Sequence, residues 1–197
     1  MSVTSKWMFV LIGNSDTGKT TIQKAVIELL NGRAFKALPS NQAYDVTHPC
    51  FLRKCRRFFV AGRSYQELLG NGDNPYTSVA EYFERRIDPV ALDPVAPPLD
   101  LSFISSHLDK TAIDLDKTAI AQIIQQAHRR FWNVCAIFLT NSLATDPQLN
   151  AAISELPWDE RWVAENAPTD DSATQHHQLR QVAGAIIQLL IERTRGW

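Results

Sequence analysis

The sequence contains only three cysteines, and their pattern suits neither disulfides nor a zinc site. Cys50, Cys55 and Cys135 are an odd number and too few for a disulfide framework, so we interpret them as free thiols. His48 stands close to Cys50 and Cys55, but a structural zinc site needs a fourth ligand and usually a closer cysteine pair. The chain is therefore expected to fold around an apolar core, without covalent or metal crosslinks.

Long apolar runs and a net charge of one sign are also missing. No stretch approaches the roughly 18 apolar residues of a membrane-spanning helix. The net charge is −1, so the whole molecule has no electrostatic preference for nucleic acid or acidic membranes. Residues 7–12 are apolar, but they lead into a glycine-containing turn and lack the small-residue cleavage site of a signal peptide. We expect a cytoplasmic protein without membrane association.

What the chain does have is enough length and apolar content for one domain. It has 197 residues, of which 45% are apolar and 21% charged, which is ordinary for a globular protein. This length suits a single α/β domain with a full core and is short for two. We therefore predict a single domain over residues 1–197.

Residues 13–20 read Gly-Asn-Ser-Asp-Thr-Gly-Lys-Thr and fit the phosphate-loop (Walker A) pattern G-x-x-x-x-G-K-[ST]. An apolar run of strand length precedes them at 7–12, and residues 20–30 carry apolar side chains at helical spacing, ended by Asn31-Gly32. Over residues 7–30 the sequence resembles the P-loop nucleoside triphosphate hydrolase superfamily. The resemblance implies binding of a nucleoside triphosphate, with ATP and Mg²⁺ as the expected ligands.

The residue types in the motif suit phosphate binding. Gly13 and Gly18 allow backbone conformations in which successive N–H groups point at phosphate oxygens. The positive end of the following helix adds to this attraction. Lys19 is expected to reach the β- and γ-phosphates, and the Thr20 hydroxyl to ligate Mg²⁺. The predicted ligand-binding residues are Gly13, Asn14, Ser15, Asp16, Thr17, Gly18, Lys19, Thr20 and Thr21.

Elsewhere in the chain, apolar segments of strand length alternate with helical patterns, which predicts α/β architecture with helices on both faces of a mostly parallel sheet. Such a sheet forms three layers, α/β/α, as in P-loop proteins. Expected strands lie at 7–12, 34–38, 57–61, 99–106 and 134–139. Expected helices lie at 20–30, from 78, over the tandem repeat at 108–120 and on to Phe131, at 148–156, from 157, and from Ser172 with Gln175 as a capping pair.

A catalytic carboxylate is harder to find. P-loop proteins usually carry an acid at the end of a second core strand, but here that strand is followed by His107, with Asp100 inside it and Asp109 just beyond. We interpret Asp109 as a helix N-cap and His107 as a strand-end histidine, with a catalytic role as the alternative. Resemblance to P-loop kinases makes Asp45 the preferred general base.

Positive charge is needed where negative charge spreads during phosphoryl transfer. The segment 33–63 is basic, and within it Arg57 is our candidate for the charge clamp, together with Arg53 and Arg56. The same arginines, interleaved with phenylalanines, could instead contact a nucleic-acid backbone. Residues 140–143 lack the Lys and Asp of the guanine-binding pattern N-K-x-D, which favours ATP over GTP; Asn141 could still approach the base.

These observations lead to one principal expectation and two alternatives. The principal one is an ATP-binding P-loop protein that acts as an ATPase or as a kinase-like phosphotransferase, with a small-molecule or macromolecular phosphoryl acceptor. The first alternative is a nucleotide-binding switch or partner-recruiting protein with little turnover. The second is a nucleic-acid-associated ATPase.

Overall fold

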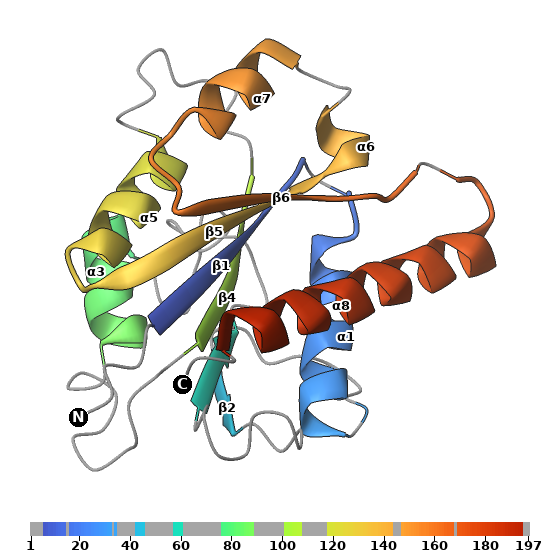
Figure 1. Ribbon diagram of the computed structural model, residues 1–197, viewed down its shortest axis with the longest axis horizontal. Helices are drawn as coiled ribbons and strands as arrows, with labels where there is room; N and C mark the ends of the chain where they lie inside the picture. Colours follow the sequence, from blue (N-terminus) through green and yellow to red (C-terminus); the bar gives the residue numbers. More distant parts are fainter. Residues whose placement is uncertain are drawn as a thin grey trace.

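The computed structural model describes residues 6–14, 16–32, 34, 42–45, 57–60, 76–88, 101–107, 118–143, 147–167 and 169–194. They form a six-stranded sheet in the order β2-β3-β4-β1-β5-β6 (Figure 1). The strands from β3 to β6 pair in parallel, whereas β2 pairs antiparallel with β3 at the edge. Helices cover both faces, so the predicted three-layer α/β/α fold with a mostly parallel sheet is confirmed.

The elements have the following bounds. The strands are β1 (Lys6–Ile12), β2 (Gln42–Asp45), β3 (Arg57–Val60), β4 (Leu101–Ser106), β5 (Trp132–Leu139) and β6 (Glu160–Ala164). The helices are α1 (Lys19–Asn31), α3 (Val79–Tyr82), the π-helix η1 (Phe83–Ile87), α5 (Ala119–His128), α6 (Thr140–Leu143), α7 (Pro147–Ser154) and α8 (Ser172–Thr194).

The central strand β1 separates two apolar clusters, one on each face of the sheet. Phe9 and Leu11 belong to the cluster that α1 and α8 cover. Met8, Val10 and Ile12 belong to the cluster on the other face, which includes side chains of α3, η1 and α5. Because a strand in the middle of such a sheet is buried on both sides, its sequence is continuously apolar rather than alternating.

β6 is the clearest difference from the predicted elements. Residues from 157 on were expected to open a short helix. Trp158 and Trp162 lie in this segment. Instead, β6 pairs in parallel with β5, and the two tryptophans contribute to different apolar clusters. Asp159 fixes the start of β6, since its Oδ2 accepts a 2.7 Å hydrogen bond from the Val134 N–H on β5. Pairing with β5 therefore makes this segment a strand rather than the expected helix.

Two helix ends also differ from expectation. α5 ends at His128, and Phe131 lies in a left-handed turn (φ 59°) with its side chain 92% exposed, so it does not continue the buried stripe. At the start of α8, Asp171 rather than Ser172 caps the helix, because its Oδ2 accepts a 2.8 Å bond from Thr174 N. Most of the expected strand at 34–38 and of the repeat at 108–120 lies outside the described residues.

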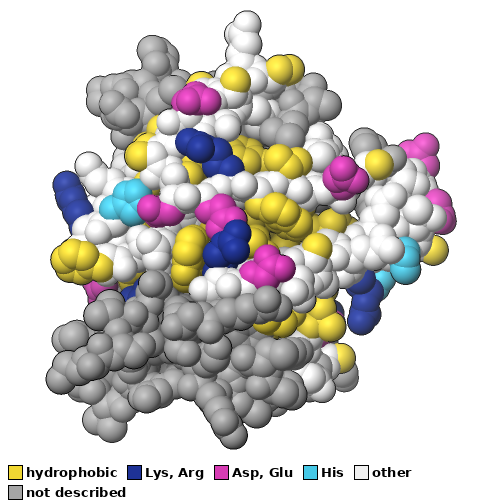
Figure 2. Space-filling view, viewed as in Figure 1, with side chains coloured by type: hydrophobic (Ala, Val, Ile, Leu, Met, Phe, Trp, Pro, Cys, Tyr) yellow, Lys and Arg dark blue, Asp and Glu magenta, His cyan; other side chains and the backbone are white. Residues whose placement is uncertain are grey.

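Among the described side chains on the face shown in Figure 2, basic, acidic and apolar groups are interspersed, and neither sign of charge gathers into a patch. Arg193 of α8 forms an ion pair with Glu160 of β6, and hydrogen bonding to this carboxylate raises the pKa of Arg193.

No helix in the described part of the chain has the length and apolar character needed to cross a membrane.

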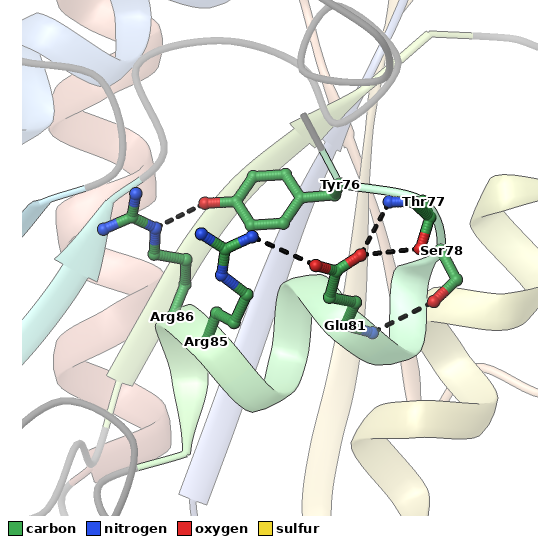
Figure 3. Close-up of polar contacts among 6 residues, drawn as sticks. All are labelled: Tyr76, Thr77, Ser78, Glu81, Arg85 and Arg86. Carbon is green, nitrogen blue, oxygen red and sulfur yellow. Dashed lines mark hydrogen bonds and ion pairs between the residues drawn. The ribbon is translucent and has the colours of Figure 1, made fainter. Parts of the chain in front are cut away.

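Side-chain hydrogen bonds cap the start of α3, the helix expected from residue 78 (Figure 3). The Ser78 hydroxyl accepts a 3.1 Å hydrogen bond from Glu81 N. In turn, Glu81 Oε2 accepts bonds of 2.7 Å from the backbone N–H and the hydroxyl of Thr77. The two bonds from Thr77, together with one from Arg85, lower the pKa of the Glu81 carboxyl from 4.5 to about 2. The ionised carboxylate therefore contributes to stability above about pH 4.5, and this contribution is lost as the pH falls through about 2.

Removing the Ser78 cap tests this helix start. We expect Ser78→Ala to lower the free energy of unfolding by about 1 kcal/mol, because the Glu81 N–H loses its acceptor. Ser172→Ala is the matched control, because Ser172 is the first residue of α8 and Asp171, not Ser172, is the cap. Removing the Ser172 hydroxyl should therefore cost less than about 0.5 kcal/mol. Urea denaturation followed by circular dichroism measures both; equal losses would contradict the assignment of the caps.

Candidate phosphate-binding site

The 13–20 loop lies where β1 ends, at the carboxyl edge of the parallel strands, and leads directly into α1 (Figure 1). Ile12 is opposite Ser106 of β4, and Gly13 N donates a 3.3 Å hydrogen bond to the Ser106 carbonyl. The loop therefore begins between the ends of two adjacent strands. Open α/β sheets commonly bind ligands at this edge.

Gly18 is the residue at which the loop turns into α1. Its φ is 86°, in the left-handed region, and its carbonyl accepts the first helical bond, from Ile22 N at 2.9 Å. A Cβ atom there would lie 2.6 Å from Leu179 Cδ2 of α8. The backbone conformation therefore favours glycine, and a Cβ atom would in addition require the Leu179 side chain to shift. α8 packs directly against the loop at this point.

Lys19 folds back over the loop and is only 7% exposed. Its Nζ donates to the Gly13 carbonyl at 3.0 Å and to the Asn14 carbonyl, and lies 3.5 Å from Nδ1 of His107. The Thr17 hydroxyl donates to the Asn14 carbonyl at 2.9 Å. The structure therefore brings Lys19 to the loop that its sequence position predicts, with the ammonium group at the tips of β1 and β4.

The remaining predicted residues of the loop differ in accessibility. Thr20, the expected Mg²⁺ ligand, is exposed in the first turn of α1, and Thr21 is partly exposed. Asp16 is exposed and has a φ of 60°, a conformation that aspartate tolerates better than most residues. Ser15 lies outside the described residues. The Thr20 hydroxyl is therefore accessible to a ligand.

Asn166, which follows β6, links the loop to two other segments. Its side chain is almost fully buried, and Nδ2 donates a 3.2 Å bond to the Thr17 carbonyl. Its Oδ1 accepts from Asn141 N at 3.2 Å, and its own N–H donates to the Thr140 hydroxyl at 2.9 Å. Asn166 was not predicted from the sequence, because the strand before it was expected to be a helix. It ties the loop to the ends of β5 and β6.

The tip of β4 carries neutral polar groups where P-loop proteins usually have an acid. The Ser105 hydroxyl lies 3.4 Å from Gln23 Oε1 on α1, and the Ser106 hydroxyl donates to the His107 carbonyl at 3.3 Å. Asp100 and Asp109 lie outside the described residues. Within the described part of β4 and its tip, the sequence supplies no carboxylate to the 13–20 loop.

The structure does not bring Asp45 and Arg57 to the loop. The two residues are paired across β2 and β3, next to Phe58, which is opposite Leu101 at the start of β4. The loop lies beyond the other end of β4, which has six residues. At about 3.3 Å per residue, the two edges of the sheet are roughly 20 Å apart. The expected general base and charge clamp therefore stand at the wrong edge. Arg53 and Arg56 lie outside the described residues.

The described residues also bear on metals and thiols. They contain no group of three or more His, Cys, Asp or Glu side chains that could hold a metal ion. Mg²⁺ commonly takes few protein ligands and completes its shell with water and substrate phosphates, so a single threonine hydroxyl fits such a site. Cys135 is a buried free thiol, as expected, and burial raises its pKa to about 12, which makes it unreactive. Cys50 and Cys55 lie outside the described residues.

Comparison with known proteins adds no further assignment. No protein-family model matches the chain, and no curated protein matches its sequence. The functional interpretation therefore depends on the motif and on the geometry of the loop.

Substitution of Gly18 tests the contact between the loop and α8. Gly18→Ala introduces both an unfavourable left-handed conformation and a clash with Leu179. Gly32→Ala is the matched control, since Gly32 also has a left-handed backbone (φ 62°) but open space around its Cβ position. We expect Gly32→Ala to cost about 1–2 kcal/mol of stability and Gly18→Ala clearly more.

Adding Leu179→Ala to Gly18→Ala should relieve the clash, so that the double variant loses less stability than the sum of the two single variants. Chemical denaturation of the wild type, Gly18→Ala, Leu179→Ala and the double variant measures this coupling. Strict additivity, or an equal cost at Gly18 and Gly32, would contradict the described contact.

Proposed function

We propose that the protein binds ATP through the 13–20 loop and hydrolyses it or transfers its γ-phosphoryl group. The observation that carries this proposal is the coincidence of sequence motif and geometry: a G-x-x-x-x-G-K-T segment forms the turn between β1 and α1, with Gly18 left-handed and Lys19 folded over the loop. Turns of this kind supply backbone N–H groups and the positive end of a helix to an anion.

Each group of the loop has a chemical part in this proposal. The Lys19 ammonium exchanges the Gly13 and Asn14 carbonyls for the β- and γ-phosphates and stabilises the charge that develops between them. The Thr20 hydroxyl, exposed in the first turn of α1, holds Mg²⁺, which supplies further positive charge to the phosphates. Asn166 keeps the loop in register with the end of β5, so that it positions rather than contacts the phosphates.

The absence of a carboxylate from residues 101–107 favours one alternative, a nucleotide-binding switch with little turnover. Such a protein would bind ATP through the same loop and release phosphate negligibly. A binding measurement and a phosphate-release assay on the same samples separate the two functions.

Lys19→Ala tests the binding site. We expect its affinity for ATP in the presence of Mg²⁺ to fall about 10- to 100-fold, since charged hydrogen bonds to phosphate are lost. The matched control is Lys24→Ala on the same helix: Lys24 pairs with Glu28 at 3.8 Å on the outer surface, and its loss should leave affinity unchanged. Calorimetric titration with ATP, GTP and a non-hydrolysable ATP analogue gives the affinities.

Thermal denaturation of both variants excludes unfolding as the cause. If ATP fails to bind the wild-type protein, or binds Lys19→Ala and Lys24→Ala equally well, the proposal fails.

A further inference from the structure

His107 lies at the junction of β4 with the 13–20 loop. Ser106, the residue before it, is bonded through its carbonyl to Gly13 N, so His107 stands beside the first glycine of the motif. Its Nδ1 is 3.5 Å from the Nζ of Lys19, the group expected to meet the γ-phosphate. The imidazole is partly exposed, so it can exchange protons with solvent. It is thus a titratable side chain close to the position of the reaction.

The contact with Lys19 defines which ring nitrogen is available. An ammonium group donates hydrogen bonds and cannot accept them. A hydrogen bond in this contact therefore needs Nδ1 of His107 as the acceptor, which assigns the proton of a neutral imidazole to Nε2. In this tautomer Nδ1 faces the Nζ of Lys19.

We propose that His107 is the proton acceptor for phosphoryl transfer at this site, an inference that rests on the proposed function. When Lys19 turns to the phosphates, Nδ1 loses the donor recorded here and can take a proton from a water or hydroxyl nucleophile. The nucleophile's oxygen forms a bond to the γ-phosphorus as its proton passes to Nδ1. The bond from the γ-phosphorus to the bridging oxygen breaks, and its electron pair leaves with ADP. The imidazolium then returns its proton to solvent.

The other candidates are less suited to this role. Asp45 is at the opposite edge of the sheet. Ser105 and Ser106 have hydroxyl groups, which are poor proton acceptors, and their oxygens already contact Gln23 and the His107 carbonyl. Of the groups described at the tips of β1 and β4, His107 has the functional group that most often serves as a general base.

His107→Asn provides the decisive variant, because the asparagine amide oxygen can still accept a hydrogen bond from Lys19 but cannot take up a proton near neutral pH. With ATP, Mg²⁺ and water as the acceptor, we expect ATP affinity within about twofold of wild type by calorimetry. The rate of phosphate release should fall about 100-fold.

His128→Asn is the matched control. His128 lies at the end of α5, where its Nε2 pairs with Asp159 at 2.9 Å, so the same substitution there should change neither binding nor rate. A rate for His107→Asn within about threefold of wild type would overturn the proposal, and so would parallel losses of binding and rate. Wild-type protein that binds ATP without releasing phosphate would overturn the role of His107 but not nucleotide binding. Failure of ATP to bind would overturn both.

A second readout needs no nucleotide. In the free protein labelled with ¹⁵N at histidine, NMR should show an unprotonated Nδ1 and a protonated Nε2 for His107, and Lys19→Met should abolish this preference. A ring protonated at Nδ1 in the free wild-type protein would contradict the contact on which the proposal depends.

Discussion

The close approach of α8 to the 13–20 loop constrains both ends of the chain at once. At Gly18 the backbone turns left-handed beside Leu179, and a Cβ atom there would require the Leu179 side chain to move. Leu179 also belongs to the apolar cluster that α8 shares with α1 and the sheet. The conformation of a loop near the N-terminus thus depends on a helix near the C-terminus. A loop packed in this way is held in shape before any ligand arrives, which lowers the entropy cost of binding.

The elements that could be predicted from the sequence are those fixed by neighbouring residues. Residues 7–32 carry their own strand, turn and helix signals, and the structure reproduces them as β1, the loop and α1. β6 could not be predicted in this way: residues from 157 on were expected to open a helix, and only pairing with β5 makes the segment a strand. The same limit applies to the site. Asn166 contacts Thr17, which lies 149 positions earlier in the sequence, and no local sequence pattern indicates such a contact.

Chain direction explains why Asp45 and Arg57 were misplaced. The last residue of a strand lies beside the carboxyl ends of its neighbours if the strand is parallel to them, and beside their amino ends if it is antiparallel. β2 runs antiparallel, so its last residue, Asp45, lies opposite Arg57, the first residue of β3. Both therefore lie at the amino edge of the parallel strands, away from the loop. Oppositely charged residues can pair across two strands at either end of the strands. The residue types alone therefore do not indicate at which end Asp45 and Arg57 lie.

If Lys19 meets phosphate as proposed, its present acceptors affect what that movement costs. Three of them are described, two backbone carbonyls and an imidazole nitrogen, and none of these three is a carboxylate. Moving a cation from a carboxylate to a phosphate would leave a buried negative charge without its partner, which is costly, whereas leaving a carbonyl or an imidazole costs only the hydrogen bond. Under the proposed function, a histidine rather than a carboxylate at the tip of β4 would avoid placing a negative charge beside the phosphates. A strand tip without a carboxylate would then favour binding of a polyanion, with His107 as the proposed proton acceptor.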